Sequence, residues 1–179
     1  MLGKRTNMVT SSASTSWDIE LNQAQKSMLS QLNSKWKMKL YMFSKMSTGW
    51  WWGLSLKSVS PAKAEVVLPY GWRTQNPFRS TYFAAQCGAA ELSTGVLANL
   101  ALQGNGKISM LVAHVESEFT KKATKAATFT CEDGEKAFKA VQEAIDTGEA
   151  RTVKMASIGK MADGTVVSKS TFTWTFKKK

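Results

Sequence analysis

Glu91 is the one charged side chain in a long run of small and apolar residues, 80–106. A carboxyl group buried in such surroundings has a raised pKa, which suits a general base that activates water or a carboxylate that attacks a carbonyl directly. Glu91 is therefore the candidate catalytic group. The alternative is a structural carboxylate bonded to a neighbouring backbone group or to a tyrosine.

The residues around Glu91 predict a buried helix. Ser80 or Thr81 can cap its start, Gly104 can end it, and alanine and glycine dominate its first half, where other backbones can approach closely. The first turn of a helix has free backbone N–H groups and the positive end of the helix dipole. We therefore expect the helix start, around Phe83 and Ala84, to be able to stabilise an oxyanion.

Cys87 precedes Glu91 by one helical turn and lies on roughly the same face. A nucleophilic cysteine needs a basic partner, and the single histidine, His114, alternates with apolar residues in a strand-like segment, which predicts a core position. The two cysteines have no CxxC spacing and no His partner at zinc-site spacing. We therefore expect neither cysteine catalysis nor a metal site.

The rest of the chain predicts strands around this helix. The strand-like segments are 52–59, 63–70, 107–119, 124–131, 150–159 and 165–176. Asp163-Gly164 predicts a hairpin turn between the last two segments, and a short helix capped by Asp133 is expected between Cys131 and Ala150. This order predicts an α+β fold in which a curved antiparallel sheet wraps round the central helix.

Ahead of this domain, which we place at residues 50–176, two N-terminal segments differ in composition. Residues 1–16, rich in Ser and Thr, predict a disordered leader, with a mitochondrial transit peptide as the alternative. Residues 17–48 predict one amphipathic helix, whose lysines face away from the stripe and allow either packing on the domain or contact with a membrane surface. We expect the packed arrangement. The apolar stripe comprises Leu21, Met28, Leu32, Trp36, Leu40 and Phe43.

The net charge of +11 is unevenly distributed. Residues 1–64 carry nine basic and two acidic side chains, and residues 177–179 form a basic tail, so the body of the domain is nearly neutral. A domain that binds nucleic acid usually carries its charge on the fold itself, so we expect no nucleic-acid partner. The chain has neither a run of about 20 apolar residues nor the start of a secretory signal, which predicts a cytoplasmic protein, with mitochondria as the alternative.

The segment from Asn76 to Gly95, NPFRSTYFAAQCGAAELSTG, resembles the helix motif of hotdog-fold acyl-CoA thioesterases of the phenylacetyl-CoA and YiiD-like kind. In that family an Asn stands ahead of the helix, a His begins it, and an acidic residue follows nine positions after the His. Asn76 and Glu91 match the first and the last of these. Tyr82 stands where the His is expected, which resembles an uncharacterised branch of the superfamily.

The resemblance implies a hotdog fold that hydrolyses an acyl-CoA or another acyl thioester without a cofactor, as a homodimer or a dimer of dimers. It implies that Glu91 is the base or nucleophile. Asn76 either orients water or holds the thioester, or it is a turn residue before Pro77, and Tyr82 either donates its hydroxyl to the carbonyl or packs as a buried ring on the hairpin. Arg73 and Arg79 either contact coenzyme A phosphates or are solvated surface residues. The alternative function is a hotdog protein that binds acyl-CoA or lipid without catalysis, as the missing His suggests.

Overall fold

The computed structural model describes residues 19–179, so the predicted leader at residues 1–16 lies outside the described residues. Within them the chain forms five helices and six strands. The helices are α1 (Gln23–Leu32), α2 (Lys35–Lys45), α3 (Ser47–Trp52), α4 (Phe83–Leu102) and α5 (Gly134–Thr147). The strands are β1 (Ser55–Val59), β2 (Ala64–Leu68), β3 (Ile108–Phe119), β4 (Ala127–Cys131), β5 (Arg151–Met161) and β6 (Val166–Lys178).

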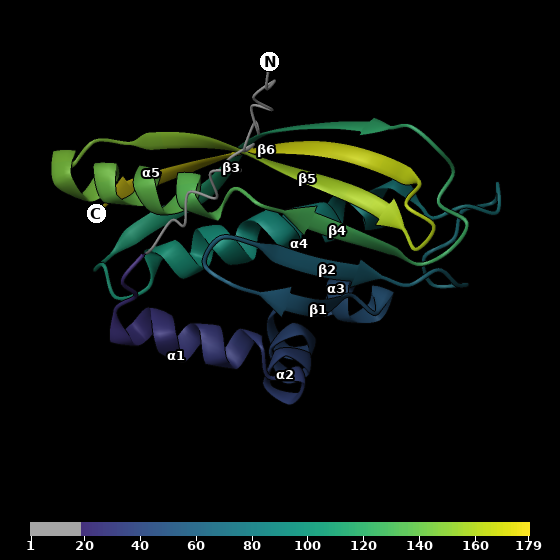
Figure 1. Cartoon of the computed structure of the whole chain (residues 1–179), viewed down its shortest axis with the longest axis horizontal. Coiled ribbons are helices and arrows are strands. Elements are labelled where there is room, and N and C mark those ends of the chain that lie inside the picture. Colours follow the sequence, from purple (N-terminus) through teal and green to yellow (C-terminus); the bar gives the residue numbers. More distant parts are fainter. Residues whose placement is uncertain (1–18) are drawn as a thin grey trace, which may run out of the picture.

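The strands form one curved antiparallel sheet in the order β1-β2-β4-β5-β6-β3, with α4 packed across one face (Figure 1). Each strand coincides with a predicted segment, and the predicted turn between β5 and β6 forms with Gly164 at φ 84°. The predicted α+β architecture is therefore confirmed. The strands at the two edges of the sheet are β1 and β3, and β3 pairs only with β6.

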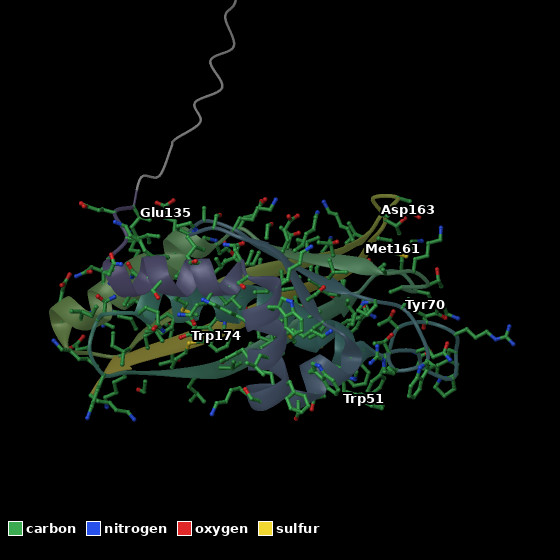
Figure 2. All side chains as sticks on the ribbon, turned by 90° about the horizontal axis from the view of Figure 1, so that it is seen from below. Trp51, Tyr70, Glu135, Met161, Asp163 and Trp174 are labelled. Atoms are coloured by element: carbon green, nitrogen blue, oxygen red, sulfur yellow. The ribbon has the colours of Figure 1, made fainter. Side chains whose placement is uncertain are left out.

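The helix α4 lies close to the sheet because its side chains are small. Gly95 faces the ring of Trp174, and the Trp174 indole N–H donates to the Thr94 hydroxyl at 3.1 Å. Next to this contact, the Ser93 and Ser157 hydroxyls lie 2.8 Å apart and share a hydrogen bond. Figure 2 places Trp174 within the body of the molecule. No helix in residues 19–179 is long and apolar enough to cross a lipid bilayer.

The start of α4 differs from the prediction, because neither Ser80 nor Thr81 caps it. The N-cap residue is Tyr82, and its side chain makes no capping hydrogen bond. The Thr81 hydroxyl donates to the Ala123 carbonyl at 3.1 Å, and the Ser80 hydroxyl donates to the Asn76 side chain at 3.2 Å. The two hydroxyls therefore bond to loop residues and not to the first turn of α4. Their spacing in the sequence does not reveal these partners.

The predicted single N-terminal helix is wrong, because the chain breaks it between α1 and α2. The break follows Asn33, whose amide donates to the Val59 carbonyl at 2.9 Å while its oxygen accepts from the Val59 N–H at 3.2 Å. Such a side chain competes with the helix backbone for hydrogen bonds. As a result α2 takes a new direction and buries Met38 and Met42. The α2 part of the predicted stripe, which is Trp36, Leu40 and Phe43, is exposed, whereas the earlier part, Leu21, Met28 and Leu32, packs against the core as expected.

Two side chains of the α1 start dock this helix onto the end of α4. The Asn22 oxygen caps α1 by accepting from the Gln25 N–H at 2.9 Å, while its amide donates to the Gln103 carbonyl at 2.8 Å. The Gln25 amide donates to the Ala101 carbonyl at 3.3 Å. Both donors satisfy carbonyls that the end of a helix leaves without intrahelical partners.

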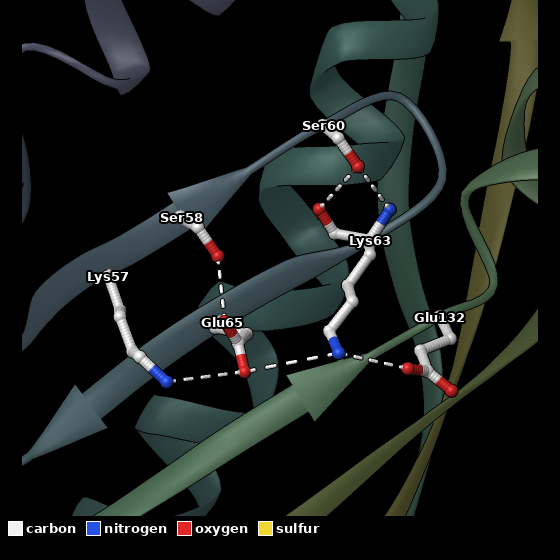
Figure 3. Close-up of polar contacts among 6 residues, drawn as sticks. All are labelled: Lys57, Ser58, Ser60, Lys63, Glu65 and Glu132. Atoms are coloured by element: carbon white, nitrogen blue, oxygen red, sulfur yellow. Dashed lines mark hydrogen bonds and ion pairs between the residues drawn. The ribbon is translucent and has the colours of Figure 1, made fainter.

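The outer face of β1, β2 and β4 carries a charged network (Figure 3). Glu65 pairs with Lys57 at 3.6 Å and accepts from the Ser58 hydroxyl at 2.8 Å, and Lys63 pairs with Glu132 at 3.1 Å. The Ser58 hydrogen bond is the main cause that lowers the pKa of Glu65. This face is therefore solvated and its lysines are neutralised by acids.

The start of α5 is packed against the β1–β2 turn so closely that only glycine fits at Gly134. A Cβ there would overlap the Pro61 carbonyl oxygen, which is backbone and cannot move aside. We expect Gly134→Ala to lower the free energy of unfolding by about 2–3 kcal/mol in urea denaturation. Gly71→Ala is the matched control, since a Cβ at Gly71 meets nothing, and should change stability by less than about 0.5 kcal/mol. Equal effects of the two substitutions would contradict this packing argument.

Candidate active site

Glu91 lies in the middle of α4, on the side of the helix that faces α3 and the β3 edge of the sheet. The prediction that its side chain is buried is wrong for the single chain, because Glu91 is exposed. The fully buried residues of α4 include Ala85, Ala89 and Leu97, whereas Glu91 lines two cavities. The walls of these cavities still remove part of its hydration, and this burial raises the pKa of the Glu91 carboxyl group.

The two cavities meet at Glu91. Cavity 1, of about 670 Å³, runs along the first half of α4 between α3 and β3. Cavity 2, of about 660 Å³, runs along the second half of α4 beneath α1 and α2. Both are lined by Met46, Glu91 and Val112. Each volume is typical of a pocket for a small organic ligand.

Cavity 1 contains the predicted oxyanion region. It is lined by Phe83, Ala84, Cys87 and Gly88 from α4. The backbone N–H groups of Phe83 and Ala84 donate to no acceptor among residues 19–179, so both remain available to a ligand. The structure therefore places Phe83, Ala84 and Glu91 around one cavity.

Cavity 2 is mostly apolar. The second half of α4 contributes Leu92, Gly95 and Val96, and Trp174 lies at its floor. Its roof comes from the N-terminal helices, through Met28, Leu32, Met38 and Tyr41. This mostly apolar lining suits an aliphatic or aromatic chain, while Lys37 and Glu91 are the charged residues that line the cavity.

Asn76 lies outside both cavities and holds its own loop together. Its side-chain oxygen accepts from the Phe78 N–H at 3.0 Å, from the Ser80 N–H at 3.2 Å and from the Ser80 hydroxyl at 3.2 Å. The loop ends at Tyr82, whose exposed ring packs edge-on against Phe83 at 4.9 Å. Neither Asn76 nor Tyr82 reaches the cavities of its own chain.

The two predicted phosphate-binding arginines are also outside the cavities. The Arg73 guanidinium lies over the ring of Trp51, 5.9 Å from its centroid. Arg79 has a positive φ of 56° in the same loop. Both side chains are exposed to solvent.

The structure separates Cys87 from any histidine. A bulge in β3 between Val112 and His114 leaves His114 exposed, so the predicted core position is wrong. The Cys87 thiol lies 3.7 Å from the Ser117 hydroxyl instead. Burial raises the pKa of the Cys131 thiol to about 12, which keeps that thiol protonated.

Sequence reasoning missed the wall that α3 contributes. Trp52 lines cavity 1, and a Cβ at Gly88 would lie only 2.7 Å from its ring. Trp52 was expected to begin a strand, whereas it ends α3. The glycine in an otherwise alanine-rich helix was the available signal, since it permits a large side chain to approach. No group of three or more His, Cys, Asp or Glu side chains that could hold a metal occurs in residues 19–179.

The architecture is that of the hotdog fold, and solved structures described as thioesterases share it. A protein of unknown function from Pseudomonas aeruginosa, described as a "Probable Thioesterase", is similar with a TM-score of 0.66 and 17% identity over 82% of this chain and 98% of that chain. A thioesterase from Haemophilus influenzae has a TM-score of 0.60 and 10% identity over 80% of this chain and 90% of that chain. At these identities the similarity establishes the fold.

A third similar protein, from Staphylococcus aureus, has been solved in two mutant forms. The form in which a glutamate is changed to alanine has a TM-score of 0.53 and 13% identity over 70% of this chain and 94% of that chain. The form in which a glutamine is changed, described as a thioesterase, has a TM-score of 0.53 and 12% identity over 71% of this chain and 95% of that chain. The two changed positions are 15 residues apart in that protein.

Residues 36–176 match the family described as "Domain of unknown function (DUF4442)". The chain therefore belongs to the DUF4442 family. No curated protein matches this chain. The predicted hotdog fold is confirmed by the similar structures, and the match to a family of unknown function agrees with the predicted uncharacterised branch.

The raised pKa of Glu91 has a consequence for stability. Burial penalises the ionised form of the Glu91 carboxyl group, so its pKa is higher in the folded than in the unfolded protein. The folded protein therefore loses stability as pH rises from the unfolded pKa of Glu91 through its raised folded pKa. Glu91→Gln removes this loss because glutamine does not ionise. We expect Glu91→Gln to raise the thermal midpoint at about pH 8 and to leave it unchanged at about pH 4, where the carboxyl is neutral. Differential scanning fluorimetry at both pH values measures this. Glu116→Gln, at an exposed residue of β3, is the matched control. A thermal midpoint of Glu91→Gln below that of the wild type at about pH 8 would refute the expectation.

Proposed function

We propose that this protein is an acyl-CoA thioesterase in which Glu91 is the general base or the nucleophile. The observation that carries the proposal is the position of Glu91, with its raised pKa, at the junction of two cavities. Cavity 2 suits the acyl chain because its lining is mostly apolar, and cavity 1 suits the thioester end because it begins at the Glu91 carboxyl group. A carboxylate at the junction is next to the bond that must break.

In the general-base form, the Glu91 carboxylate takes a proton from a water molecule while the oxygen of that water attacks the thioester carbonyl carbon. The tetrahedral oxyanion then collapses, the carbon–sulfur bond breaks, and the leaving thiolate takes the proton back from Glu91. In the nucleophilic form, the Glu91 carboxylate attacks the carbonyl carbon itself, the carbon–sulfur bond breaks, and coenzyme A leaves as a thiolate. Water then hydrolyses the resulting anhydride, which releases the carboxylic acid, regenerates the Glu91 carboxylate and supplies the proton that the thiolate takes up. Both forms yield a carboxylic acid and free coenzyme A.

The length of α4 argues that one chain cannot complete the site. Phe83 and Glu91 are eight residues apart, which is about 12 Å along a helix. Hydrogen-bond donors must lie about 3 Å from the oxyanion. One thioester carbonyl therefore cannot contact both the N–H group of Phe83 and the Glu91 carboxylate of the same helix. We infer a homodimer in which Glu91 of one subunit acts with Phe83 and Ala84 of the other.

The free edge of the sheet offers the surface for this homodimer. β3 is 12 residues long, and its outer edge pairs with no strand in residues 19–179. Three apolar side chains on it are exposed, at Leu111, Val115 and Phe119. Long apolar edge strands that are left unpaired tend to associate with another chain. Pairing there would also carry the loop with Asn76 and Tyr82 towards the partner.

The spacing of Asn76 and Glu91 supports a joint role for the two residues. They are 15 positions apart, as are the glutamine and glutamate changed in the Staphylococcus aureus protein. Within this chain Asn76 lies outside the cavities, so its amide can act only on a Glu91 from another subunit. Tyr82 and the two arginines of this loop, Arg73 and Arg79, would reach the thioester and the coenzyme A phosphates by the same route.

The role of Glu91 is tested by Glu91→Gln, assayed by thiol release from short, medium, long and aromatic acyl-CoAs. Loss of a general base should lower kcat by about 10²–10⁴-fold, whereas Glu135→Gln, at an exposed residue of α5, should leave it unchanged. In the wild type, kcat/KM should rise with pH as Glu91 loses its proton. The midpoint of this rise should lie above the ordinary pKa of a glutamate, because burial raises the pKa of Glu91. Unchanged turnover in Glu91→Gln would eliminate this mechanism.

The shared site is tested by mixing two impaired variants. Asn76→Asp keeps the oxygen that holds the loop and removes the amide donor, and Glu91→Gln removes the base. After equal amounts are unfolded and refolded together, half of the dimers carry one intact site, so about a quarter of the wild-type activity should return. Each variant refolded alone is the control. Activity no higher than the average of the two controls would contradict a site shared between subunits.

A second candidate function is an acyl-CoA or lipid-binding protein without catalysis. Tyr82 in the place of the usual His and the apolar lining of cavity 2 favour it. This function predicts that acyl-CoA raises the thermal midpoint while no thiol is released at any chain length. The same acyl-CoA series therefore separates the two functions.

A further inference from the structure

The outer face of α2 carries apolar side chains that nothing in residues 19–179 covers. Trp36, Leu40 and Phe43 follow one another at helical spacing and are 84%, 67% and 59% exposed. The opposite side of the same helix packs into the core through Met38 and Met42. A helix with apolar side chains on both faces has a second surface that water solvates poorly.

The exposed stripe continues onto α3. The Phe43 ring packs edge-on against Trp50 with centroids 5.1 Å apart, and the next residue, Trp51, packs against Trp72 at 5.6 Å. All four of these rings are exposed. Figure 2 places Trp51 at the rim of the molecule. We call Trp36, Leu40, Phe43 and Trp50 the aromatic face.

The segment that carries the aromatic face contains only basic charge. No Asp or Glu occurs between Leu21 and Ala64. On the α2 helix, Lys37 and Lys39 flank the stripe on either side, because each residue turns the helix by about 100°. In the described part of the chain no ion pair neutralises the lysines of the N-terminal helices, which are Lys26, Lys35, Lys37, Lys39 and Lys45.

This arrangement contrasts with the lysines of the sheet. Lys57 and Lys63 are paired with Glu65 and Glu132 (Figure 3), so they offer little charge to a ligand. The lysines of the aromatic face therefore supply free positive charge beside exposed tryptophan and phenylalanine rings. Such a combination is typical of helices that lie in the interface of an anionic membrane.

We propose that the aromatic face docks this protein onto an anionic lipid bilayer. The rings of Trp36, Phe43 and Trp50 insert at the level of the headgroups, and the flanking lysines contact lipid phosphates. A second copy of the chain is a poorer occupant, because pairing two such faces would bring two unneutralised lysine clusters together. Docking would also place cavity 2, which the inner side of α2 lines through Met38, next to the lipid.

The lipid requirement is tested by co-sedimentation of the full chain with vesicles. We expect binding to vesicles that contain phosphatidylglycerol, weakening as salt is added, and no binding to phosphatidylcholine alone. Equal binding to both vesicles, or to neither, would overturn the proposal. A thioester assay is not needed, so this result is independent of the proposed catalysis.

The surface is tested with two variants that change only exposed side chains. Replacing Trp36, Leu40 and Phe43 together by serine should weaken partitioning by at least about tenfold, whereas Phe78→Ser, at another exposed ring, should have no effect. Replacing Lys35 and Lys39 by glutamine should weaken partitioning into vesicles by about fivefold for each lysine. The matched charge control is the same replacement of Lys121 and Lys122, which are exposed in the β3–β4 loop and should not affect partitioning.

The thermal midpoint and the oligomeric state of each variant complete the experiment. Unchanged midpoints show that weaker binding is not unfolding. If the serine variant binds vesicles normally but loses self-association in light scattering, the aromatic face is a contact between subunits and the proposal is wrong. Equal losses in the control variants would also overturn it, because binding would then depend on overall charge or apolar surface.

Discussion

The close contact between α4 and the tryptophans on its two sides determines where the chemistry of this protein can occur. Gly88 lies against Trp52 of α3, and Gly95 lies against Trp174 of β6. Glu91 stands between these two glycines, so its carboxyl group is held at the point where the two cavities meet. A helix with larger side chains at either glycine would push α3 or the sheet away, since close-packed interiors accommodate even one extra methyl group poorly.

The same burial brings polar groups of α4 into the interior, and each one needs a partner. Thr94 accepts from the Trp174 indole, and Ser93 is bonded to Ser157 of β5. These bonds join the helix to two neighbouring strands and keep its orientation on the sheet, because an unpaired buried hydroxyl would be costly. The outer face of β1, β2 and β4 is charged and solvated. The side of α4 that lines the two cavities and the outer edge of β3 are therefore the surfaces that we assign to ligands and to other subunits.

The N-terminal helices add a feature that the hotdog domain alone does not need. They attach through polar side chains at two points, Asn22 at the end of α4 and Asn33 at the end of β1. This attachment turns the methionines of α2 inwards, where Met38 helps to roof cavity 2, and the aromatic residues outwards. One helix thus contributes to the apolar pocket and to the outer surface at the same time.

The element order, the strand segments, the central helix and Glu91 as the only charge on it were all predicted by the sequence, because periodicity and turn residues are local properties. The break after Asn33, the exposure of Trp36 and the roles of Ser80 and Thr81 were not, because they depend on hydrogen bonds to residues far away in the chain. His114 illustrates the same limit, since one bulge reverses the face that alternation assigns to it. The residue pattern was therefore sufficient to identify the candidate carboxylate and to place it on a long central helix. That this carboxylate lines two cavities instead of facing the core could not be predicted, because those cavities form only where α3 and β3 pack around α4.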